Sequence, residues 1–441
     1  MDLEQRLDAV VDAARAERRI VGAVLMVRRR GEVLYEKALG MADREAGRPM
    51  QMDAIFRLSS LTKPIVAATV LALVDAGKLR LDDPVTRHLP EFRPRMADDS
   101  TPEITIHHLL THTSGLSSAS ILSEEETAAG VNKWRLDTAE ILRRMADMPL
   151  LFAPGTGWSY GPSIDVLGVI AGNLVGGTLE DAIRQYVADP LGMSDTRFTV
   201  TDASRLAAAY ANEDNGAVLM GDPHSVPNPF GGIATYDPGR IFDAEAFQSG
   251  GGGMAGTGPD FVNLLETIRS GGGAILKPAT LAMGLANQTP QLTQSQAPGW
   301  GFSYFGAWLD DPALAGSPAA QGTNRWGGIY GHNWFFDPSQ ELSVISMSNT
   351  GLEGCDGPFK ARCATLCMPA SSGCRRAGQL VVSGQPEALN AHRDLEHQRH
   401  QGTPSYPADL AGPGKAGHRG VAGDQIGRRG VSPRRDRGAW L

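Results

Sequence analysis

Several features that would assign a class at once are scarce or missing in this chain. There are only 4 cysteines in 441 residues, and all fall late, at Cys355, Cys363, Cys367 and Cys374. They form no pair of C-x-x-C elements, so we expect free thiols, without a zinc ribbon or a disulfide scaffold. No apolar run approaches the roughly 18 residues that a membrane-spanning helix needs. The sequence therefore gives no sign of a zinc ribbon, a disulfide scaffold or a membrane-spanning helix.

Further absences narrow the function. The first residues, Met1 to Leu7, are acidic and amphipathic and lack the basic and apolar regions of a signal peptide, so we expect a cytoplasmic protein. A formal net charge of -8 argues against nucleic acid as a partner. The glycine run 250–253 is not followed by Gly-Lys-Ser/Thr, so it is no phosphate loop.

A single serine–lysine pair stands out among what is present. Ser60 and Lys63 form the only i, i+3 serine–lysine spacing, directly before an apolar, helix-like run that ends at Gly77. At helical spacing the two side chains share one face, so the amine would lie beside the hydroxyl. A serine hydroxyl needs such a neighbour to take its proton before it can act as a nucleophile. The alternative is a surface lysine one turn beyond a helix-capping serine.

A tyrosine in a turn-rich loop is the second candidate. Tyr160 lies in the segment 154–163, just before another apolar helical run. Loops held by a packed scaffold often carry catalytic groups. A phenol acts as a base once it loses its proton, and the ammonium of Lys63 would favour that form. Taken alone, Tyr160 could equally be a buried aromatic residue with a satisfied hydroxyl.

The third candidate is the segment from Trp326 to Trp334. Two adjacent glycines on an expected edge strand allow a ligand to approach the backbone. The N–H groups of Ser60 and Ile329 would then form an oxyanion hole. The alternative without a functional role is a structural bulge with aromatic packing. If the segment does bind the ligand, we expect five of its residues to line the substrate pocket: Trp326, Gly327, Gly328, His332 and Trp334.

These three segments, in this order, resemble the serine β-lactamase and penicillin-binding protein superfamily. The family's S-x-x-K box is matched by Ser60 and Lys63. Its Y-x-N box is matched at Tyr160, and its K-T-G box is replaced by Trp326-Gly327-Gly328. The W-G-G form is similar to the family VIII carboxylesterases, as are three linking stretches. These stretches are His108 to Leu116, Asp165 to Gly168 and Ser249 to Met254.

Two departures from the β-lactamase pattern bear on the substrate. The resemblance implies that the third-box lysine of β-lactamases holds the substrate carboxylate. Trp326 removes that cation and Pro162 replaces the second-box asparagine, which favours neutral esters over β-lactams. The adjacent Arg325 could partly restore the charge. His112 belongs to one of the linking stretches, and we interpret it as structural.

The order of periodic segments predicts a two-lobed α+β fold. A helix over 2–17 and strands over 20–28, 33–39 and 55–57 precede Ser60, and strands over 301–308, 328–336 and 342–347 follow later. Both sets would share one sheet. Helical periodicity dominates between them. The resemblance implies a β-lactamase/transpeptidase-like fold, an antiparallel sheet flanked by helices with an inserted all-helical lobe.

The expected domain boundaries follow the change in composition. A catalytic domain would span 1–368, with its sheet lobe at about 1–80 and 290–368 and its helical lobe at about 81–289. The remaining 369–441 is rich in Gly, Pro and Arg and without periodicity, so we expect a disordered or non-native tail. A nucleic-acid-binding tail is the alternative.

Together, these motifs predict a serine carboxylesterase for short-chain esters. Ser60 would be the nucleophile, with Lys63 and Tyr160 accepting its proton, and no metal or organic cofactor is needed. The expected partner is a small-molecule ester, without nucleic acid or membrane. Two alternatives stay open: a β-lactamase or D-amino-acid peptidase of the same fold, and a non-catalytic binding protein that kept it.

Overall fold

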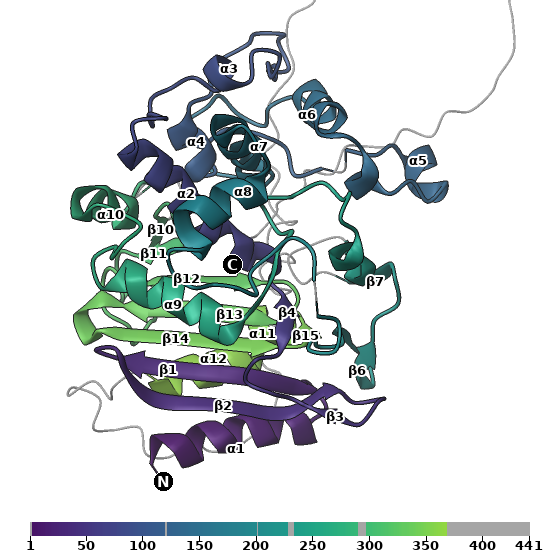
Figure 1. Ribbon diagram of the computed structural model, residues 1–441, viewed down its shortest axis with the longest axis vertical. Coiled ribbons are helices and arrows are strands. Elements are labelled where there is room, and N and C mark those ends of the chain that lie inside the picture. The colour runs from purple at the N-terminus through teal and green to yellow at the C-terminus, as the bar shows by residue number, and fades with distance from the viewer. Residues whose placement is uncertain (1, 120, 201, 228–232, 290–296, 368–441) are drawn as a thin grey trace, which may run out of the picture. The chain divides into compact units, whose positions relative to one another are not determined.

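The main sheet carries the architecture of the described chain. The computed structural model describes residues 2–119, 121–200, 202–227, 233–289 and 297–367, so the expected tail lies outside them. Within those residues eight strands form one antiparallel sheet, in the order β10-β11-β12-β13-β14-β1-β2-β3 (Figure 1). The strands are β1 (Gly22–Arg29), β2 (Glu32–Asp43), β3 (Arg48–Pro49), β10 (Trp300–Phe302), β11 (Ala307–Leu309), β12 (Asn324–Gly328), β13 (His332–Asp337) and β14 (Leu342–Ser348).

The two ends of the described chain meet in this sheet. β1 pairs with β14, so that Ala23 lies opposite Ser348. The turn between β1 and β2 places Arg30 at φ 55° and Gly31 at φ 80°, the left-handed pair typical of a tight hairpin. This confirms the prediction that N-terminal and C-terminal strands share one sheet, and it confirms the antiparallel fold class.

Helices cover both faces of the sheet, and successive side chains of β1 point alternately into the two cores between helices and sheet. Val24 and Met26 belong to a core shared with α9 (Gly258–Arg269) and α2 (Thr62–Asp75). Leu25 and Val27 belong to a second core shared with the helices on the other face. Because successive side chains of a strand point to opposite faces, a nearly continuous apolar run is required here.

The second core is built by two terminal helices, α1 (Leu3–Ala16) and α12 (Pro358–Cys367). The Asp2 side chain caps α1 by accepting from the Gln5 N–H at 2.8 Å, which satisfies one of its free donors. The helix buries Leu7, Val11 and Ala14, which lie on one face at helical spacing. The predicted N-terminal helix is thereby confirmed.

The inserted segment 81–289 is not entirely helical, which corrects that part of the prediction. Short strands lie between its helices, and α9 packs against β1 and β14 of the sheet. Its other helices are α3 (Val85–His88), α4 (Ile106–Leu110), α5 (Glu124–Ala128), α6 (Thr138–Asp147), α7 (Ser163–Val175), α8 (Leu179–Ile183) and α10 (Pro278–Leu285). Its strands are β5 (Tyr210–Glu213), β6 (Gly216–Leu219), β7 (His224–Pro227), β8 (Ile233–Tyr236) and β9 (Ala255–Thr257).

The short strands escaped the periodicity analysis because each spans only three or four residues. β5 pairs with β6 and also with β15 (Thr350–Gly351), and β7 pairs with β8. β9 pairs with β4 (Ile55–Arg57), which confirms the strand expected before the nucleophile. The remaining elements are single turns: η1 (Ser59–Leu61), η2 (Lys133–Arg135), η3 (Arg184–Ala188), η4 (Pro238–Phe242), η5 (Pro338–Gln340) and α11 (Glu353–Asp356).

Two C-terminal strand predictions were too long. The expected strand 301–308 is two strands, β10 and β11, which pair as a hairpin. The expected strand 328–336 is broken by a tight turn, in which the N–H of Gly331 donates to the carbonyl of Gly328 at 2.8 Å. Gly331 has φ 113°, which a glycine adopts readily. The chain therefore reverses where an apolar run had indicated continuity.

The central helix of the molecule is α2. Its residues are apolar on all sides and eleven of its fourteen are buried, as expected of a helix enclosed by other elements. It packs against α7, α8 and α10. Within the described residues no single helix has the length and hydropathy of a membrane span, although the bent pair Ser163–Val175 and Leu179–Ala188 passes that test by length and composition.

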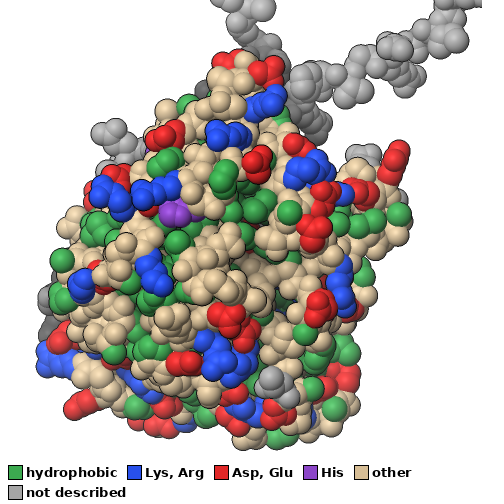
Figure 2. All heavy atoms as spheres, turned by 45° about the horizontal axis from the view of Figure 1, so that its top comes forward, with side chains coloured by type: hydrophobic (Ala, Val, Ile, Leu, Met, Phe, Trp, Pro, Cys, Tyr) green, Lys and Arg blue, Asp and Glu red, His purple; other side chains and the backbone are tan. Residues whose placement is uncertain are grey.

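The surface and the thiols are unremarkable in the part of the chain described. Figure 2 shows acidic and basic side chains interspersed with apolar ones over the displayed face. Cys355, Cys363 and Cys367 are free thiols, as the spacing predicted, and Cys374 lies outside the described residues.

Candidate active site

The turn that carries Ser60 is fixed from both sides. Pairing of β4 with β9 ends at Arg57, and the next N–H, that of Leu58, donates to the carbonyl of Met254 at 2.8 Å. Ser59 then adopts φ 45°, a left-handed conformation that is rare for a residue with a Cβ atom. Ser60 follows in η1 and leads directly into α2. The strained turn presents the hydroxyl at the wall of a cavity instead of burying it in the core.

Lys63 lies beside that hydroxyl, as its spacing predicted. Its Nζ donates to Oγ of Ser60 at 3.1 Å and to the carbonyl of Gly251 at 2.6 Å. Gly251 is itself held in place, since its N–H donates to the carboxylate of Asp165 on α7 at 3.0 Å. Asp165 also accepts a hydrogen bond from the Ser249 hydroxyl. The carboxylate thus fixes the glycine loop, and the loop fixes the lysine.

Tyr160 completes the contact around the Ser60 oxygen. Its hydroxyl is 2.8 Å from Oγ of Ser60, and its ring centroid lies 4.5 Å from Nζ of Lys63. The indole N–H of Trp326 donates to the Tyr160 hydroxyl oxygen at 3.2 Å. The phenol therefore contacts the Ser60 hydroxyl, the Lys63 ammonium and the Trp326 indole at once. The structure therefore brings together all three predicted catalytic residues.

A buried histidine supports the tyrosine loop. The ring of His112 lies 4.7 Å from that of Tyr160, and its Nδ1 accepts the N–H of Gly161 at 3.4 Å. Burial, together with the nearby Lys63 cation, places the pKa of His112 well below its usual range. The neutral ring can therefore keep accepting from the backbone, which matches the structural role expected for it.

The third segment borders the site along an open stretch of β12. β11 pairs only with Asn324 and Arg325, so the following residues have no strand partner on that side. A Cβ atom on Gly328 would lie 2.5 Å from Oγ of Ser59 and 2.8 Å from the carbonyl oxygen of Leu58. Glycine is therefore needed for the strand to approach the turn that carries the nucleophile.

Ile329 follows at the end of β12 and lines the same cavity as Ser60. It lies in the tight turn between Gly328 and Gly331, where its carbonyl accepts from the N–H of Leu352 at 2.9 Å. The oxyanion hole formed by the N–H groups of Ser60 and Ile329 stays a prediction. The shared cavity is the structural requirement that it meets.

The residues predicted to line the substrate pocket do not line the cavity, so that prediction was wrong. The Trp326 indole is directed at the Tyr160 hydroxyl, and Trp334 is fully buried next to Phe261 and Phe336. Alternation along the central strand β13 turns Trp334 into the core below α9, where no ligand reaches. None of the following residues lines the cavity: Trp326, Gly327, Gly328, His332 and Trp334.

His332 is also a core residue. It is 1% exposed, and its Nε2 lies 2.8 Å from the carbonyl oxygen of Arg57, to which the N–H donates. The other ring nitrogen has no partner among the described residues. Burial lowers the pKa of His332 to about 4, so the ring is neutral at physiological pH. Its place behind β4 supports the strand that leads to the nucleophile.

Arg325 does not supply the missing cation, which corrects the expectation that it could. Its guanidinium lies 3.7 Å from the ring centroid of Trp300 and does not line the cavity. Burial lowers its pKa to about 10. Because neighbouring residues of a strand point to opposite faces, the side chains of Arg325 and Trp326 diverge.

The actual cavity has a volume of about 400 Å³ and two kinds of wall. One wall is apolar and comes mainly from α6 and the loops beside it. The other carries charged groups from four separate segments. The apolar wall is formed by Ile121, Ile141, Met145, Met148 and Phe247. The charged groups outside the serine–lysine pair are Arg57, Lys133, Asp165, Asp237 and Arg240.

These lining residues were missed because no spacing links them in the sequence. Lys133 lies in η2 and Arg240 in η4, more than a hundred positions apart. Burial lowers the pKa of the Lys133 ammonium and lowers that of Arg240 to about 10. Asp165 alone could be recognised in the sequence, since it begins the stretch from Asp165 to Gly168 that resembles the family. In the described residues no group of three or more His, Cys, Asp or Glu side chains is placed to hold a metal ion.

Comparison with known proteins agrees with this geometry. The family model described as Beta-lactamase matches residues 7–362. Esterase EstB of Burkholderia gladioli is 48% identical over 366 residues, which covers 81% of this chain and 93% of the relative. The solved structure of EstCE1, titled a hydrolase with promiscuous acyltransferase activity, has a TM-score of 0.79 at 38% identity and covers 83% of this chain and 98% of its own. A penicillin-binding protein homologue from Pyrococcus abyssi shares the fold, with a TM-score of 0.62 at 22% identity, covering 82% of this chain and 76% of its own.

Proposed function

This chain belongs to the beta-lactamase family, and we propose that it is a serine carboxylesterase that hydrolyses short-chain esters through an acyl-serine intermediate. One observation carries the proposal. The Ser60 oxygen has hydrogen bonds to both the Lys63 ammonium and the Tyr160 hydroxyl at the wall of a cavity large enough for a small ester. A hydroxyl in this arrangement has a base within reach and room for an acyl group.

Acylation follows from these contacts. In the reactive form of the site, Tyr160 is a phenolate beside the Lys63 ammonium, and its oxygen accepts the Ser60 proton while Oγ forms a bond to the ester carbonyl carbon. The carbonyl oxygen gains the negative charge, which the N–H groups of Ser60 and Ile329 stabilise. The tetrahedral intermediate then expels the alkoxide. Tyr160 returns the proton to that oxygen, so the alcohol leaves neutral and Ser60 keeps the acyl group.

Deacylation reverses the same proton path with water in place of the alcohol. Water gives a proton to Tyr160 as its oxygen attacks the acyl carbon, and Oγ of Ser60 takes the proton back when the carboxylic acid departs. Lys63 remains held by Gly251 throughout, so its charge stays next to the tyrosine ring. The cycle consumes one water molecule and needs no further reactant.

Acyl transfer to an alcohol is the second candidate activity. EstCE1, which resembles this chain over nearly its whole length, is titled a hydrolase with acyltransferase activity. The same acyl-serine partitions between water and any alcohol that enters the cavity, so both activities need only one site. β-Lactam hydrolysis is less favoured, because Trp326 engages Tyr160 where β-lactamases are expected to carry a cation.

Labelling of the nucleophile tests the proposal. The wild-type protein is treated with an organophosphonate ester, and peptide mass spectrometry locates the adduct. We expect one adduct, on Ser60, together with turnover of 4-nitrophenyl butyrate faster than that of a chromogenic cephalosporin. Ser60→Ala should lower ester turnover by at least about a thousandfold.

The matched control is Ser204→Ala, which changes an exposed serine in a loop away from the cavity and should leave turnover as in wild type. An adduct on another serine, or equal ester turnover by Ser60→Ala and wild type, would refute the assignment. A cephalosporin rate above the ester rate would make the protein a β-lactamase.

A further inference from the structure

The cavity holds more cations than carboxylates. Two of the cations are already committed, because Lys63 serves the nucleophile and the Arg57 guanidinium donates to the carbonyls of Pro238 and Ala207. The four cationic residues of the lining are Arg57, Lys63, Lys133 and Arg240, and its two acidic residues are Asp165 and Asp237. Lys133 and Arg240 therefore remain as charges whose role the reaction does not explain.

Both carboxylates of the cavity are occupied by other donors. Asp165 accepts from the Ser249 hydroxyl and the Gly251 N–H. Asp237 accepts the indole N–H of Trp134 at 2.9 Å. Among the described residues, neither Lys133 nor Arg240 forms an ion pair within 4.0 Å. The two carboxylates therefore attract the cations over a longer distance but form no ion pair with them.

One indole ring brings the two cations together. Nζ of Lys133 lies 4.6 Å from the ring centroid of Trp134, and Cζ of Arg240 lies 3.7 Å from it. The ring is fixed by its own bond to Asp237, and Arg240 is fixed by a bond to the carbonyl of Phe247 at 3.0 Å. Cation–π contact compensates part of the repulsion between like charges, but it does not use the ammonium donors of Lys133 or the guanidinium donors of Arg240 other than the one bonded to Phe247.

A carboxylate is the chemical group that this arrangement fits. A guanidinium can donate two parallel bonds to it and an ammonium adds a third donor and a point charge. Partial burial of both cations strengthens such a contact relative to one at the open surface. Burial lowers the pKa of Lys133 and that of Arg240, and the charges of Asp165 and Asp237 offset only part of this effect.

We propose that Lys133 and Arg240 form an anion subsite, and that the preferred substrates are esters carrying a carboxylate away from the scissile bond. The inference rests on the proposed esterase function and adds a substrate class to it. It also reverses the expectation of neutral esters drawn from the loss of the third-box lysine. The positive charge is present in the cavity but comes from η2 and η4 instead of β12.

Matched pairs of esters provide the test. One pair places the charge on the acyl side: mono-4-nitrophenyl adipate and its uncharged methyl ester. The other places it on the alcohol side: 4-butyryloxybenzoate and its methyl ester. For each pair the ratio of kcat/KM, charged over uncharged, is measured for wild type, Lys133→Met, Lys133→Glu and Arg240→Met.

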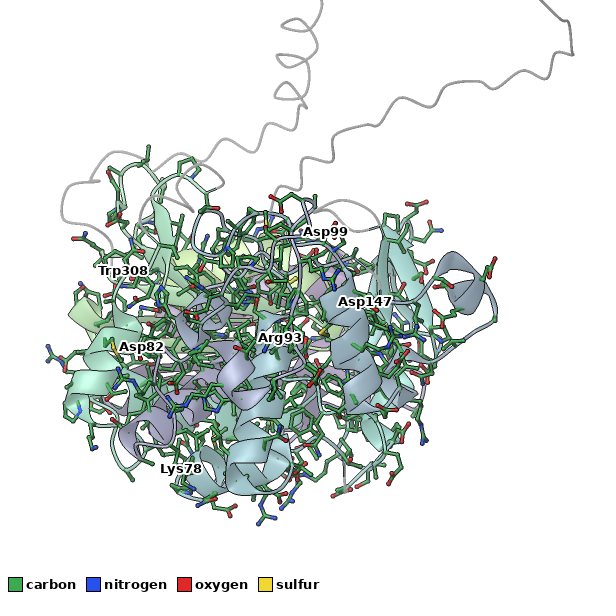
Figure 3. The ribbon with its side chains drawn as sticks, turned by 90° about the horizontal axis from the view of Figure 1, so that it is seen from above. Lys78, Asp82, Arg93, Asp99, Asp147 and Trp308 are labelled. Atoms are coloured by element: carbon green, nitrogen blue, oxygen red, sulfur yellow. The ribbon has the colours of Figure 1, made fainter. Side chains whose placement is uncertain are left out.

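In at least one pair, the wild-type ratio should exceed one and fall as NaCl is raised. Lys133→Met should lower that ratio about tenfold, and Lys133→Glu should lower it further. The control is Lys78→Met, which removes a cation from an exposed bend after α2 (Figure 3) and should keep the wild-type ratio. The pair that responds identifies the side of the ester that carries the charge. Ratios that neither Lys133 variant changes, in both pairs, would overturn the subsite.

A binding measurement separates this inference from the esterase proposal. Calorimetry with Ser60→Ala compares monomethyl adipate with dimethyl adipate, and it needs no turnover. Tighter binding of the monoanion, lost in the Ser60→Ala/Lys133→Met double variant, supports the subsite even if no ester is hydrolysed. Equal weak binding of both compounds, together with Ser60-dependent hydrolysis of neutral esters, would leave the esterase standing and refute the subsite.

Discussion

At the scale of single residues, the oxygen of Ser60 is the point on which three distant segments converge. Lys63 reaches it from the first turn of α2, Tyr160 from the loop before α7, and Trp326 reaches Tyr160 from the sheet. The tryptophan therefore acts on the tyrosine and not on the ligand directly. This explains why a residue that was expected to line the pocket is absent from its wall while still belonging to the site.

The buried His332 should make stability depend on pH in the acid range. Its pKa is about 4 in the folded protein because of burial, against about 6.5 in an unfolded chain. The unfolded state thus binds the proton more readily, so stability is complete above about pH 6.5 and is lost as the pH falls toward 4. We expect His332 to contribute about 3 kcal/mol of this loss. Urea denaturation at pH 7 and pH 4 measures it.

The matched variant is His332→Gln, whose amide can still donate to the carbonyl of Arg57 but does not titrate. Its free energy of unfolding should fall about 3 kcal/mol less than that of wild type between the two pH values. The buried His112 also resists protonation, so it contributes equally to both proteins and cancels in the comparison. Parallel pH curves for the two proteins would contradict the argument.

The nucleophile and its lysine could be predicted because η1 continues directly into α2, so that residues three apart in sequence lie side by side. Tyr160 became a candidate through its turn-rich loop and its chemistry with Lys63, and the order of the three boxes then distinguished it from a buried structural tyrosine. The cavity walls could not be predicted, because η2, α6, η4 and the glycine loop contribute one or two side chains each. Which side of β13 faces a ligand depends on the packing of α9 against the sheet, and this left Trp334 misassigned.

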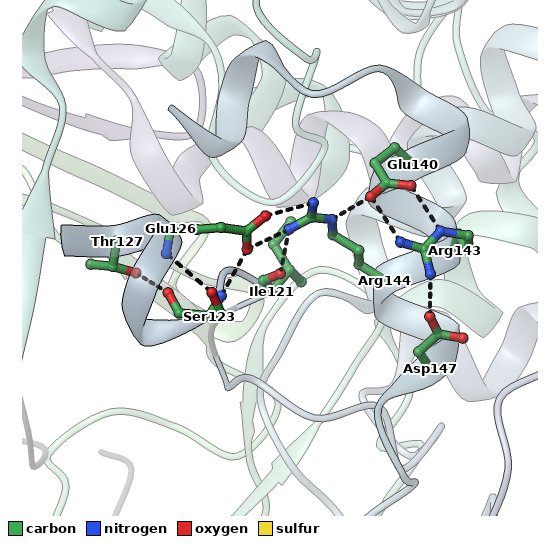
Figure 4. A network of polar contacts seen from close by, with 8 residues as sticks. All are labelled: Ile121, Ser123, Glu126, Thr127, Glu140, Arg143, Arg144 and Asp147. Atoms are coloured by element: carbon green, nitrogen blue, oxygen red, sulfur yellow. Dashed lines mark hydrogen bonds and ion pairs between the residues drawn. The ribbon is translucent and has the colours of Figure 1, made fainter. Parts of the chain in front are cut away.

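At the scale of elements, α5 and α6 form a separate support for the apolar wall. Ser123 caps α5, and Arg144 on α6 binds Glu126 through two hydrogen bonds of 2.8 Å and Glu140 at 2.6 Å (Figure 4). The same guanidinium donates to the carbonyl of Ile121, which lines the cavity. Hydrogen bonds from Arg144 and Ser123 hold the pKa of Glu126 at about 2, and hydrogen bonds from Arg143 and Arg144 hold that of Glu140 at about 2. The network therefore stays charged across the working pH range.

Removal of Arg144 should make the apolar wall more mobile and weaken substrate binding without changing the catalytic residues. For Arg144→Met we expect KM for 4-nitrophenyl hexanoate to rise about threefold, with kcat nearly unchanged, because α5 loses its tie to α6. Hydrogen exchange of residues 121–130 should become faster in the same variant. Steady-state kinetics and exchange mass spectrometry provide the two measurements.

Arg143→Met is the control for that variant. Arg143 binds Glu140 and Asp147, which lie on its own helix, so its loss leaves α5 attached (Figure 4). Its KM and exchange pattern should match wild type. A kcat loss in Arg144→Met larger than its KM change would mean that the helix pair orders the catalytic groups instead.

The elements themselves were predicted best where they are long. α1 and α2 each extend over three turns or more, and each was found within a few residues of its expected bounds. The strands β5 to β8 are too short to show alternation, and they were absorbed into the lobe expected to be helical. The turn at Gly328–Gly331 was missed because the two residues inside it, Ile329 and Tyr330, are typical of strands.

At the scale of the whole molecule, the described chain is built on two cores separated by the sheet. The core on the α9 side also contains α2 and the floor of the cavity, and the core on the other side contains α1 and α12. A defect in the second core should therefore reduce stability without reshaping the site. Phe359, which is fully buried on α12, is the residue with which to test this.

Phe359→Ala should lower the free energy of unfolding by about 3–5 kcal/mol, because it leaves a cavity where an aromatic ring packed. Ester turnover at 25 °C should stay within about twofold of wild type while the protein remains folded. Urea denaturation and steady-state kinetics measure the two effects. The control is Phe242→Ala, at a ring that is 52% exposed and should cost less than about 0.5 kcal/mol. Equal losses in both variants would show that the terminal helices are not a structural core.

The pairing of β1 with β14 determines how late in translation the main sheet can be completed. Residues 22–29 leave the ribosome first, yet their partner at 342–348 follows more than three hundred residues later. Until then one edge of the first hairpin, with its apolar side chains, is exposed and able to join the wrong strand. A nascent chain that stops short of β14 carries every catalytic residue and still has no completed sheet to hold them.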